Sequence, residues 1–244
     1  MLILLPPSET KRPGGVGVSI DKLAIIWAAL EPAREVLYSA LGELCKNSDA
    51  AAKALGLGKK NLHEADLNLQ LLTAPTMPAL QRYTGVLYDA LDFDGLSAEA
   101  LRRADQQLFI QSALFGLLPS MQQIPNYRLS ATSKIPGVRL KKLWTEAHAE
   151  VWPRLIGPVL DMRSRSYVEL NPIPPDRESK FMEVLGQDGR ALNHFNKKAK
   201  GAFVRAALEN GLASFAEVPE AAAKAGLRAE LTEQQVLLYV PEGY

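Results

Sequence analysis

The chain has 244 residues, of which 47% are hydrophobic and 23% are charged, and its formal net charge at pH 7 is +1. This balance is typical of a globular protein with a sizeable core. A net charge of +1 is too small to hold a nucleic acid or a membrane surface by overall charge, so such a partner would need a local basic patch. The single cysteine, Cys45, excludes an intrachain disulfide and a cysteine-cluster metal site, and it is typical of a reducing cytoplasm.

The first five residues, "MLILL", predict a buried strand that ends at Pro6. They are too few to form the apolar part of a signal peptide. From about residue 21 to residue 72 an alanine-rich pattern predicts successive helices, with Pro32 near the start of the second. The longest apolar run in this part, 23–30, is much shorter than a membrane span. We therefore predict a cytoplasmic protein without a membrane partner.

The middle of the chain combines helices with one predicted core strand. Two helices are predicted at 83–91 and 97–108, the second with Ser97 as its N-cap. The segment "LFIQSALFGLL" is β-branched or aromatic in its first half, which predicts a strand that runs into a turn. Residues 119–137 contain three prolines and are predicted to form a long ordered loop, after which a helix resumes at 139–155.

The last third of the chain is rich in predicted strands. They are "PVLDM" (158–162), "SYVEL" (166–170), "KFMEVL" (180–185), "ALNHF" (191–195) and "VLLYV" (236–240). A helix is predicted over 196–210, with Gly211 closing it. Strands near both ends of the chain indicate one mixed sheet. The predicted fold class is therefore α+β, with a single helix-rich domain spanning 1–244 around that sheet.

The segment "ALGLGKKNLHEADLNLQL" (54–71) contains two closely spaced glycines, Gly56 and Gly58, between helical patterns. Glycines permit a tight turn and close approach to a phosphate, and Lys59 and Lys60 add attraction to a nucleic-acid backbone. This pattern predicts a helix-hairpin-helix element within about 41–71. A plain helix–helix turn with a glycine C-cap is the alternative, because short glycine motifs are weak signals.

Basic residues are concentrated in two stretches that contain no acid, one between Asp105 and Glu146 and the other between Asp188 and Glu209. If these stretches converge in space, they form a basic cleft in an otherwise neutral protein. If acids from elsewhere neutralise them, they are ordinary solvated surfaces. The sequence leaves both interpretations open.

The start of the predicted helix at 196–210 carries an unusual concentration of lysines. With Asn196 as its cap, Lys197, Lys198 and Lys200 fall in the first turn, where cations oppose the helix dipole. Such a helix often presents bases and backbone N–H groups together to an anion, and Arg205 extends the same surface. A solubilising lysine cluster is the alternative interpretation.

Other polar residues give weaker signals. His63, His148 and His194 have no ligand-like spacing, so we predict no metal site and an exposed His148. Arg163 and Arg165 alternate with serines at the start of a predicted strand, where one pair would share a face. The loop "PPSETK" places Ser8, Thr10 and Lys11 directly after the first strand, a common position for anion contacts. No P-loop or dinucleotide-binding motif is present, and no cofactor is predicted.

Six ordered segments together resemble the YaaA family of peroxide stress proteins. They are "LILLPPSETK", "YTGVLYDAL", "SALFGLLPSMQQIPNYRL", "LKKLWTEA", "RSRSYVEL" and "FNKKAKGAFVR". The resemblance implies a single α+β domain of unusual topology, with a helix-hairpin-helix element beside a positively charged cleft. It also implies DNA binding and protection against peroxide in the oxidative stress response, by limiting free intracellular iron.

Two functional hypotheses follow. The first is non-sequence-specific binding of double-stranded DNA, with phosphate contacts from Gly56, Gly58, Lys59, Lys60, Lys197, Lys198, Lys200 and Arg205. The second is an enzyme acting on a phosphorylated or nucleotide-like small molecule in the same cleft. Its candidate residues are Ser8, Thr10, Lys11, Tyr83, Thr84, Ser112, Tyr127, Arg128, Ser166, Tyr167 and Lys198. Convergence of these polar groups on one pocket would favour the enzyme.

Overall fold

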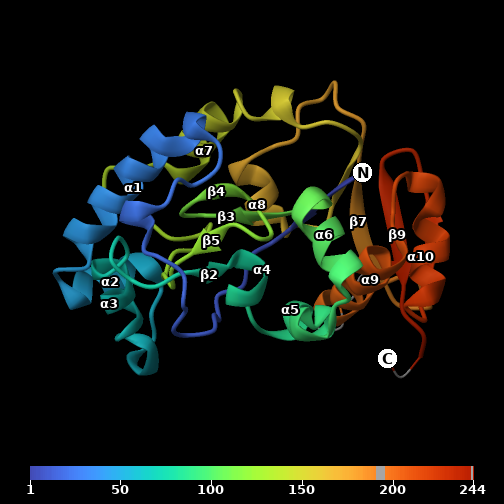
Figure 1. Cartoon of the computed structure of the whole chain (residues 1–244), viewed down its shortest axis with the longest axis horizontal. Coiled ribbons are helices and arrows are strands. Elements are labelled where there is room, and N and C mark those ends of the chain that lie inside the picture. The colour runs from blue at the N-terminus through green and yellow to red at the C-terminus, as the bar shows by residue number, and fades with distance from the viewer. Residues whose placement is uncertain (191–195, 243) are drawn as a thin grey trace.

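The computed structural model describes residues 1–190, 196–242 and 244, and a mixed sheet runs through its centre (Figure 1). Its strands follow the order β4-β3-β1-β6-β7-β9-β8. Their bounds are β1 (Leu2–Leu5), β3 (Leu108–Ser112), β4 (Gly116–Pro119), β6 (Val159–Asp161), β7 (Ser179–Leu185), β8 (Arg228–Leu231) and β9 (Gln235–Tyr239). Two shorter strands, β2 (Met77–Pro78) and β5 (Gln123–Ile124), pair with each other outside this sheet.

The five inner strands are parallel, and the edge strands β4 and β8 are antiparallel to their neighbours. All four residues of β1 are buried, which explains why its sequence is continuously apolar rather than alternating. Its register places Leu4 opposite Phe109 of β3 on one side and opposite Asp161 of β6 on the other. The N-terminal strand is therefore an inner strand of the sheet.

The chain changes direction across the sheet between β1 and β6. After β1 the chain continues to β3, which lies on one side of β1 in the sheet. After β6 it continues to β7, which lies on the opposite side. In open sheets of this kind the connections leave neighbouring strands in opposite directions, and a crevice remains outside the carboxyl ends of those two strands. The loop after β1 and the segment after β6 border that crevice.

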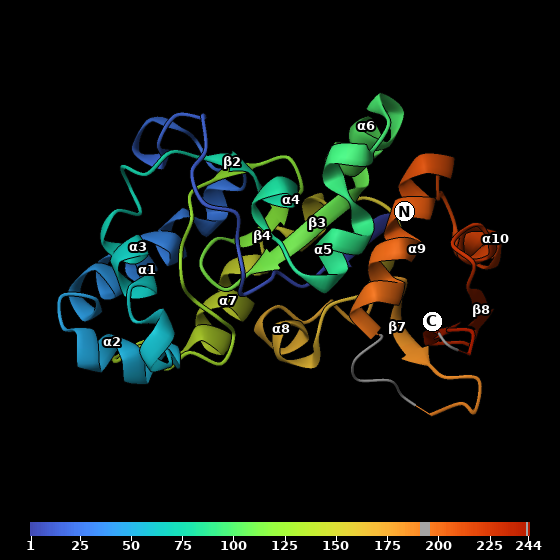
Figure 2. The same ribbon diagram turned by 90° about the horizontal axis from the view of Figure 1, so that it is seen from below.

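Ten α-helices surround the sheet in the described part of the chain. They are α1 (Glu31–Leu44), α2 (Ser48–Leu55), α3 (Glu64–Leu69), α4 (Ala79–Arg82), α5 (Val86–Leu91), α6 (Ala98–Gln107), α7 (Leu140–His148), α8 (Arg165–Leu170), α9 (Asn196–Asn210) and α10 (Val218–Lys224). Helices α1 to α3 lie at one end of the molecule and α9 and α10 toward the other, with α8 between them in both views (Figures 1 and 2). None of the described helices is long and apolar enough to cross a membrane.

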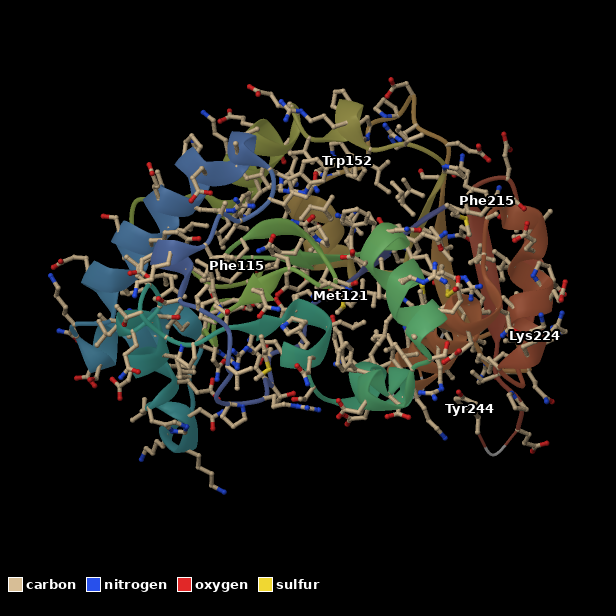
Figure 3. All side chains as sticks on the ribbon, in the orientation of Figure 1. Phe115, Met121, Trp152, Phe215, Lys224 and Tyr244 are labelled. Carbon is tan, nitrogen blue, oxygen red and sulfur yellow. The ribbon has the colours of Figure 1, made fainter. Side chains whose placement is uncertain are left out.

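Helix α9 is held against the sheet by close contacts. It packs against β7 and is covered by α5, α6 and α10. The contact with α5 requires a glycine, because a Cβ at Gly201 would lie 2.1 Å from the carbonyl oxygen of Leu87. Side chains fill the space around the sheet, with Phe115 buried in the interior and Lys224 at the surface (Figure 3).

Several sequence predictions are confirmed by the fold. The α+β class and the single mixed sheet are as expected. Pro32 lies in the first turn of α1, and the Ser97 side chain accepts a hydrogen bond from the Ala100 N–H at the start of α6. Helix α9 ends at Asn210 and is followed by Gly211 with a φ of +84°. The predicted strand at 191–195 and His194 lie outside the described residues.

Two secondary-structure predictions are wrong. Residues 21–30 form short 3₁₀ turns and irregular chain, because the Arg34 guanidinium donates hydrogen bonds to the carbonyls of Ile25, Ile26 and Trp27 and keeps them out of a helix. The "SYVEL" segment is not a strand, since residues 165–170 form α8 directly after β6.

The predicted exposure of His148 and the expected shared face of the arginines are also wrong. His148 is buried, and its Nε2 accepts the Leu117 N–H at 3.0 Å while Nδ1 lies 2.7 Å from the Trp144 carbonyl oxygen. Arg163 is buried in an ion pair with Asp161, whereas Arg165 is exposed on α8. Asn196 is already within α9 rather than a cap before it.

Candidate functional site

A pocket of about 490 Å³ opens at the carboxyl ends of β1 and β6, where the topology predicts a crevice. We call it the strand-end pocket. The loop after β1, the start of α5, the loop at 130–132, the start of α8 and the first turn of α9 all contribute to it. Its lining residues are Pro6, Pro7, Ser8, Glu9, Thr10, Thr84, Gly85, Val86, Leu87, Tyr88, Ser130, Ala131, Thr132, Ser164, Ser166, Tyr167 and Lys197.

Hydroxyl groups are concentrated in the strand-end pocket. The Ser8 and Thr10 hydroxyls lie 3.1 Å apart, and Thr10 Oγ1 donates to the carbonyl of Thr84 at 3.1 Å. Gly85 has a φ of +98°, and a Cβ there would lie 3.1 Å from Thr10 Oγ1. Glycine therefore allows the loop after β1 to approach the start of α5. Across the pocket, the Ser164 and Ser166 hydroxyls are 3.3 Å apart.

A buried chain of hydroxyls lies close to this pocket. Ser112 Oγ accepts the N–H groups of Leu114 and Phe115, so its own proton is available for the Tyr127 hydroxyl at 2.8 Å. Tyr127 can then donate to the Tyr83 hydroxyl at 2.7 Å. Burial raises the pKa of both tyrosines, so these phenols remain protonated. The chain has one preferred direction, from the turn after β3 toward Tyr83.

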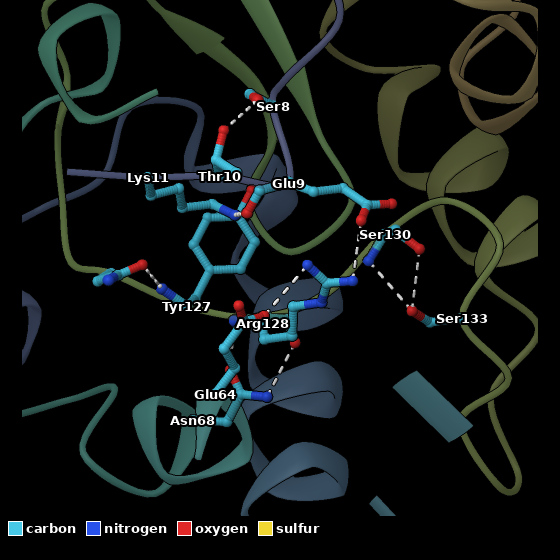
Figure 4. Close-up of polar contacts among 11 residues, drawn as sticks. Ser8, Glu9, Thr10, Lys11, Glu64, Asn68, Tyr127, Arg128, Ser130 and Ser133 are labelled. Atoms are coloured by element: carbon cyan, nitrogen blue, oxygen red, sulfur yellow. Dashed lines mark hydrogen bonds and ion pairs between the residues drawn. The ribbon is translucent and has the colours of Figure 1, made fainter. Parts of the chain in front are cut away.

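Lys11 lies beside these tyrosines. Its Nζ is 4.4 Å from the centre of the Tyr127 ring and donates to the backbone carbonyl of Glu9 at 3.1 Å (Figure 4). The pKa of Lys11 is lowered to about 7, mainly by desolvation and secondly by repulsion from Arg128. A substantial fraction of Lys11 is thus a neutral amine at physiological pH.

Arg128 connects the loop after β1 to α3. Its guanidinium is 2.9 Å from a carboxylate oxygen of Glu9 and 3.2 Å from one of Glu64 (Figure 4). Asn68 accepts the Arg128 backbone N–H and donates to its carbonyl, which fixes the backbone as well. These contacts assign Arg128 a positioning role between the strand-end pocket and the helical end of the molecule.

Comparisons with known proteins identify the family of the chain. The sequence model of the family described as "Peroxide stress protein YaaA" matches residues 1–230. The chain belongs to the YaaA family of peroxide stress proteins. A UPF0246 protein of Corynebacterium efficiens is 39% identical over 241 residues, which cover 96% of each chain. A UPF0246 protein of Streptomyces coelicolor is 38% identical over 87% of this chain and 85% of its own, and an uncharacterized protein of Campylobacter jejuni is 27% identical over 86% and 85%.

In this YaaA-family protein the structure brings most of the predicted small-molecule residues together. Ser8, Thr10, Thr84, Ser166 and Tyr167 all line the strand-end pocket. The second group lies close to it, in the hydroxyl chain and the polar contacts around Arg128, and consists of Lys11, Tyr83, Ser112, Tyr127 and Arg128. Lys198 points elsewhere, because its Nζ lies 4.4 Å above the Tyr244 ring.

The residues predicted to contact DNA are dispersed. Lys59 and Lys60 are exposed at the α1–α3 end of the molecule, in a 3₁₀ turn (Lys59–Asn61) between α2 and α3. Lys197 and Lys200 belong to α9, toward the other end. Arg205 donates to the carbonyls of Leu91, Asp92 and Gly95 and pairs with the Asp92 carboxylate at 2.9 Å, so it braces the connection after α5.

The two basic stretches of the sequence are partly neutralised, both by the acids at their own ends and by an acid from elsewhere in the chain. Lys141 pairs with Glu169, Lys142 with Glu146, and Arg190 with Asp188. The structure does not show one continuous basic cleft in the described residues. Among those residues there is also no cluster of three or more His, Cys, Asp or Glu side chains that could hold a metal ion.

Sequence reasoning missed Glu9, Gly85, Ser130 and Thr132 as pocket residues, and it placed Lys197 only on a DNA surface. The segment "LSATSK" at 129–134 carried a usable signal, since it holds three hydroxyl residues within a loop predicted to be ordered. Its position opposite the loop after β1 depends on contacts between distant parts of the chain, which local patterns do not reveal.

Proposed function

We propose that this peroxide stress protein is an enzyme that binds a phosphorylated or nucleotide-like molecule in the strand-end pocket. The observation that carries the proposal is convergence, because five separate segments bring hydroxyl groups and one lysine to the switch point of the sheet. Ligands of open α/β sheets bind outside the carboxyl ends of the strands at such points. The pocket volume of about 490 Å³ is within the usual range for small ligands.

The chemical character of the lining suits a molecule with an apolar ring and several polar groups. Pro6, Pro7, Val86 and Leu87 supply the apolar surface, and Tyr167 supplies an aromatic ring. The serine and threonine hydroxyls can donate to or accept from sugar and phosphate oxygens. Lys197 contributes a positive charge at the edge.

The groups near the pocket also include a candidate acid–base residue. Lys11 follows Thr10 directly, and an amine with a pKa of about 7 can exchange protons efficiently near neutral pH. We assign Lys11 this role within the proposed activity. The hydroxyl chain from Ser112 through Tyr127 to Tyr83 holds the tyrosine ring beside which Lys11 lies.

Thermal shift and calorimetry with a panel of nucleoside monophosphates and sugar phosphates test the proposal. A ligand at about 100 times its Kd should raise the melting temperature by roughly 5 °C or more. The variant Thr10→Val should lower the affinity by about fivefold or more, since one hydrogen bond contributes about 1 kcal/mol. The matched control is Thr73→Val, at an exposed threonine outside the pocket. If no member of the panel binds, the proposal is wrong.

Double-stranded DNA binding is a second candidate, favoured by the turn between α2 and α3. Gly56 has a φ of +67°, as its C-cap position requires, but Gly58 has an ordinary φ of −76°. Among the described residues, no atom would lie within 4 Å of a Cβ at Gly58. Neither backbone conformation nor internal contacts therefore require this glycine, whereas close approach of an external backbone would. Lys59 and Lys60 follow directly and are exposed, so this turn is our candidate helix-hairpin-helix element.

Fluorescence anisotropy with labelled duplex across a salt series tests this second candidate. Duplex binding should weaken steeply with salt, and replacing Lys59 and Lys60 by alanine should reduce the logarithmic salt slope by about 2. Lys53→Ala, at an exposed position in the last turn of α2, is the matched control. A salt slope near zero would contradict DNA binding. Protection against peroxide through limited free iron remains a prediction from the family resemblance.

A further inference from the structure

A second cavity, of about 310 Å³, adjoins the strand-end pocket at the carboxyl ends of β6 and β7. The two share Pro6, Leu87, Ser164 and Lys197 as lining residues, so they are adjacent. We call the second one the basic cavity. Its remaining lining residues are Met162, Arg163, Arg165, Phe181, Met182, Glu183, Val184, Asn196 and Lys200.

The basic cavity differs from its neighbour in charge. Arg165 comes from α8, and Lys197 and Lys200 come from α9, so two helices direct three cations to one space. Arg163 is already neutralised by Asp161 at 2.7 Å, and Glu183 is the one acid among the lining residues. With the Arg163–Asp161 pair set aside, three cations face one carboxylate, so the lining has an excess of positive charge.

Lys200 is the most informative of the three cations. Its side chain is 6% exposed, and Nζ donates one hydrogen bond, to the carbonyl of Met162 at 3.0 Å. An ammonium has three donors, and within the described residues Nζ forms no ion pair. Burying such a group is unfavourable unless an opposite charge compensates it. Burial lowers the pKa of Lys200 to about 8, even though the nearby carboxylates of Asp161 and Glu183 raise it.

Arg165 and Lys197 complement Lys200 from the solvent side. Both are exposed, and the Arg165 guanidinium lies 4.2 Å from the centre of the Phe181 ring, which restricts its position at the cavity. A ligand group here would contact one buried ammonium and two accessible cations. Guanidinium and ammonium donors around one space are typical of phosphate recognition.

We infer that the basic cavity binds the phosphate group of the ligand whose sugar or ring portion occupies the strand-end pocket. The ligand class is thus a nucleoside monophosphate or a similarly sized phosphomonoester, held across both cavities. This inference rests on the proposed function, because it assumes an occupant of the strand-end pocket. Lys200, Lys197 and Arg165 bind the phosphate, and the hydroxyl groups bind the remainder.

The test compares matched ligands by isothermal titration calorimetry. A nucleoside 5′-monophosphate should bind at least tenfold more tightly than its nucleoside. Lys200→Met, which preserves the length of the buried side chain, should remove most of that difference while leaving nucleoside affinity unchanged. Lys197→Ala, at a residue that lines both cavities, should lower the affinity for the nucleotide more than that for the nucleoside. Lys198→Ala, next to Lys197 but on the Tyr244 ring, should change neither affinity. If Lys200→Met does not fold, the double variant Arg165→Gln/Lys197→Ala replaces it.

The outcomes distinguish the phosphate assignment of the basic cavity from the proposed ligand binding in the strand-end pocket. Equal binding of nucleoside and nucleotide, unaffected by the variants, overturns the phosphate assignment and leaves the strand-end pocket as a nucleoside site. Failure of both ligands and of the phosphomonoester panel overturns both proposals. A dinucleoside monophosphate probes the source of the phosphate. If it binds more tightly than the monophosphate and loses affinity in Lys200→Met, the phosphate recognised is an internal diester of a nucleic-acid strand, and the phosphomonoester assignment is overturned.

Discussion

Glu9 and Arg128 form an ion pair at 2.9 Å that joins the loop after β1 to a residue 119 positions later in the chain. Arg128 also contacts Glu64 of α3, so its side chain links the pocket loop to the helical end of the molecule. Glu9 is largely exposed, with 65% of its side-chain surface accessible, and this half of the link is accordingly weak. The buried Arg128 guanidinium is the group on which the arrangement depends.

Replacing Arg128 with methionine should raise the pKa of Lys11, because repulsion from Arg128 is the second-largest cause of its depression. The same change should lower the free energy of unfolding by about 1–3 kcal/mol, since Glu64 loses its partner in a partly buried position. Denaturant unfolding and the pH dependence of Lys11 acylation measure the two effects. An unchanged Lys11 profile in a folded variant would contradict the electrostatic coupling.

Lys11 should react with an amine-specific acylating reagent in a pH profile with a midpoint near 7. An ordinary lysine has a pKa of about 10.4, so its reactivity should still be rising where Lys11 has reached its plateau. Mass spectrometry after brief labelling at pH 6 to 9 distinguishes the sites, with the exposed Lys53 as the comparison. A Lys11 profile parallel to that of Lys53 would remove the basis for its acid–base role.

The Gly201→Ala variant should be destabilised by about 1–3 kcal/mol, because its new methyl group overlaps the Leu87 carbonyl oxygen and forces α5 and α9 apart. Since both helices contribute lining residues, ligand affinity should also fall. Gly42→Ala in α1 is the matched control, because in the described part of the chain nothing beyond its neighbours and the backbone of α1 would lie within 4 Å of its Cβ. That variant should be more stable by about 0.5–1 kcal/mol, because alanine is the better helix former. Equal unfolding midpoints for the two variants would refute the steric explanation.

His148 should make the protein less stable as the pH falls from about 6.5 to about 4. Burial is the main cause that lowers its folded pKa from 6.5 to about 4. Between these values the unfolded chain binds a proton that the folded chain does not, so stability present above pH 6.5 is lost on acidification, by up to about 3 kcal/mol. Urea unfolding across this range measures the loss. The exposed His63→Gln variant should keep the same slope, whereas His148→Gln should flatten it.

Local signals in the sequence predicted the parts of the fold that depend on local physics. The apolar run of β1, the proline at the start of α1 and the Ser97 cap all act within a few residues. The failures have tertiary causes. Arg34, which belongs to the following helix α1, donates hydrogen bonds to backbone carbonyls of residues 25–27 and so prevents a helix there. Helix α8 forms in a short segment whose alternating polarity resembled that of a strand.

The candidate site was predicted in the same uneven way. Ser8 and Thr10 could be identified because they follow a predicted strand directly, at a position where ligands commonly bind. Lys200 was predicted to share a surface with Lys197 because both fall in the first turn of the helix. It is instead buried, with its Nζ bonded to the Met162 carbonyl after β6 and 5.5 Å from the centre of the Phe181 ring in β7. Whether a basic residue faces solvent, an acid or a cavity depends on elements distant in sequence.

The inner position of β1 has a consequence for synthesis of the protein. Both strands that flank residues 2–5, β3 and β6, follow more than a hundred residues later in the chain. At translation rates of about 5–20 residues per second, β6 emerges roughly 10–30 s after β1. Until β3 emerges, roughly 5–20 s after β1, this apolar, β-prone segment has no native partner in the sheet, and it is then exposed to pairing with other chains.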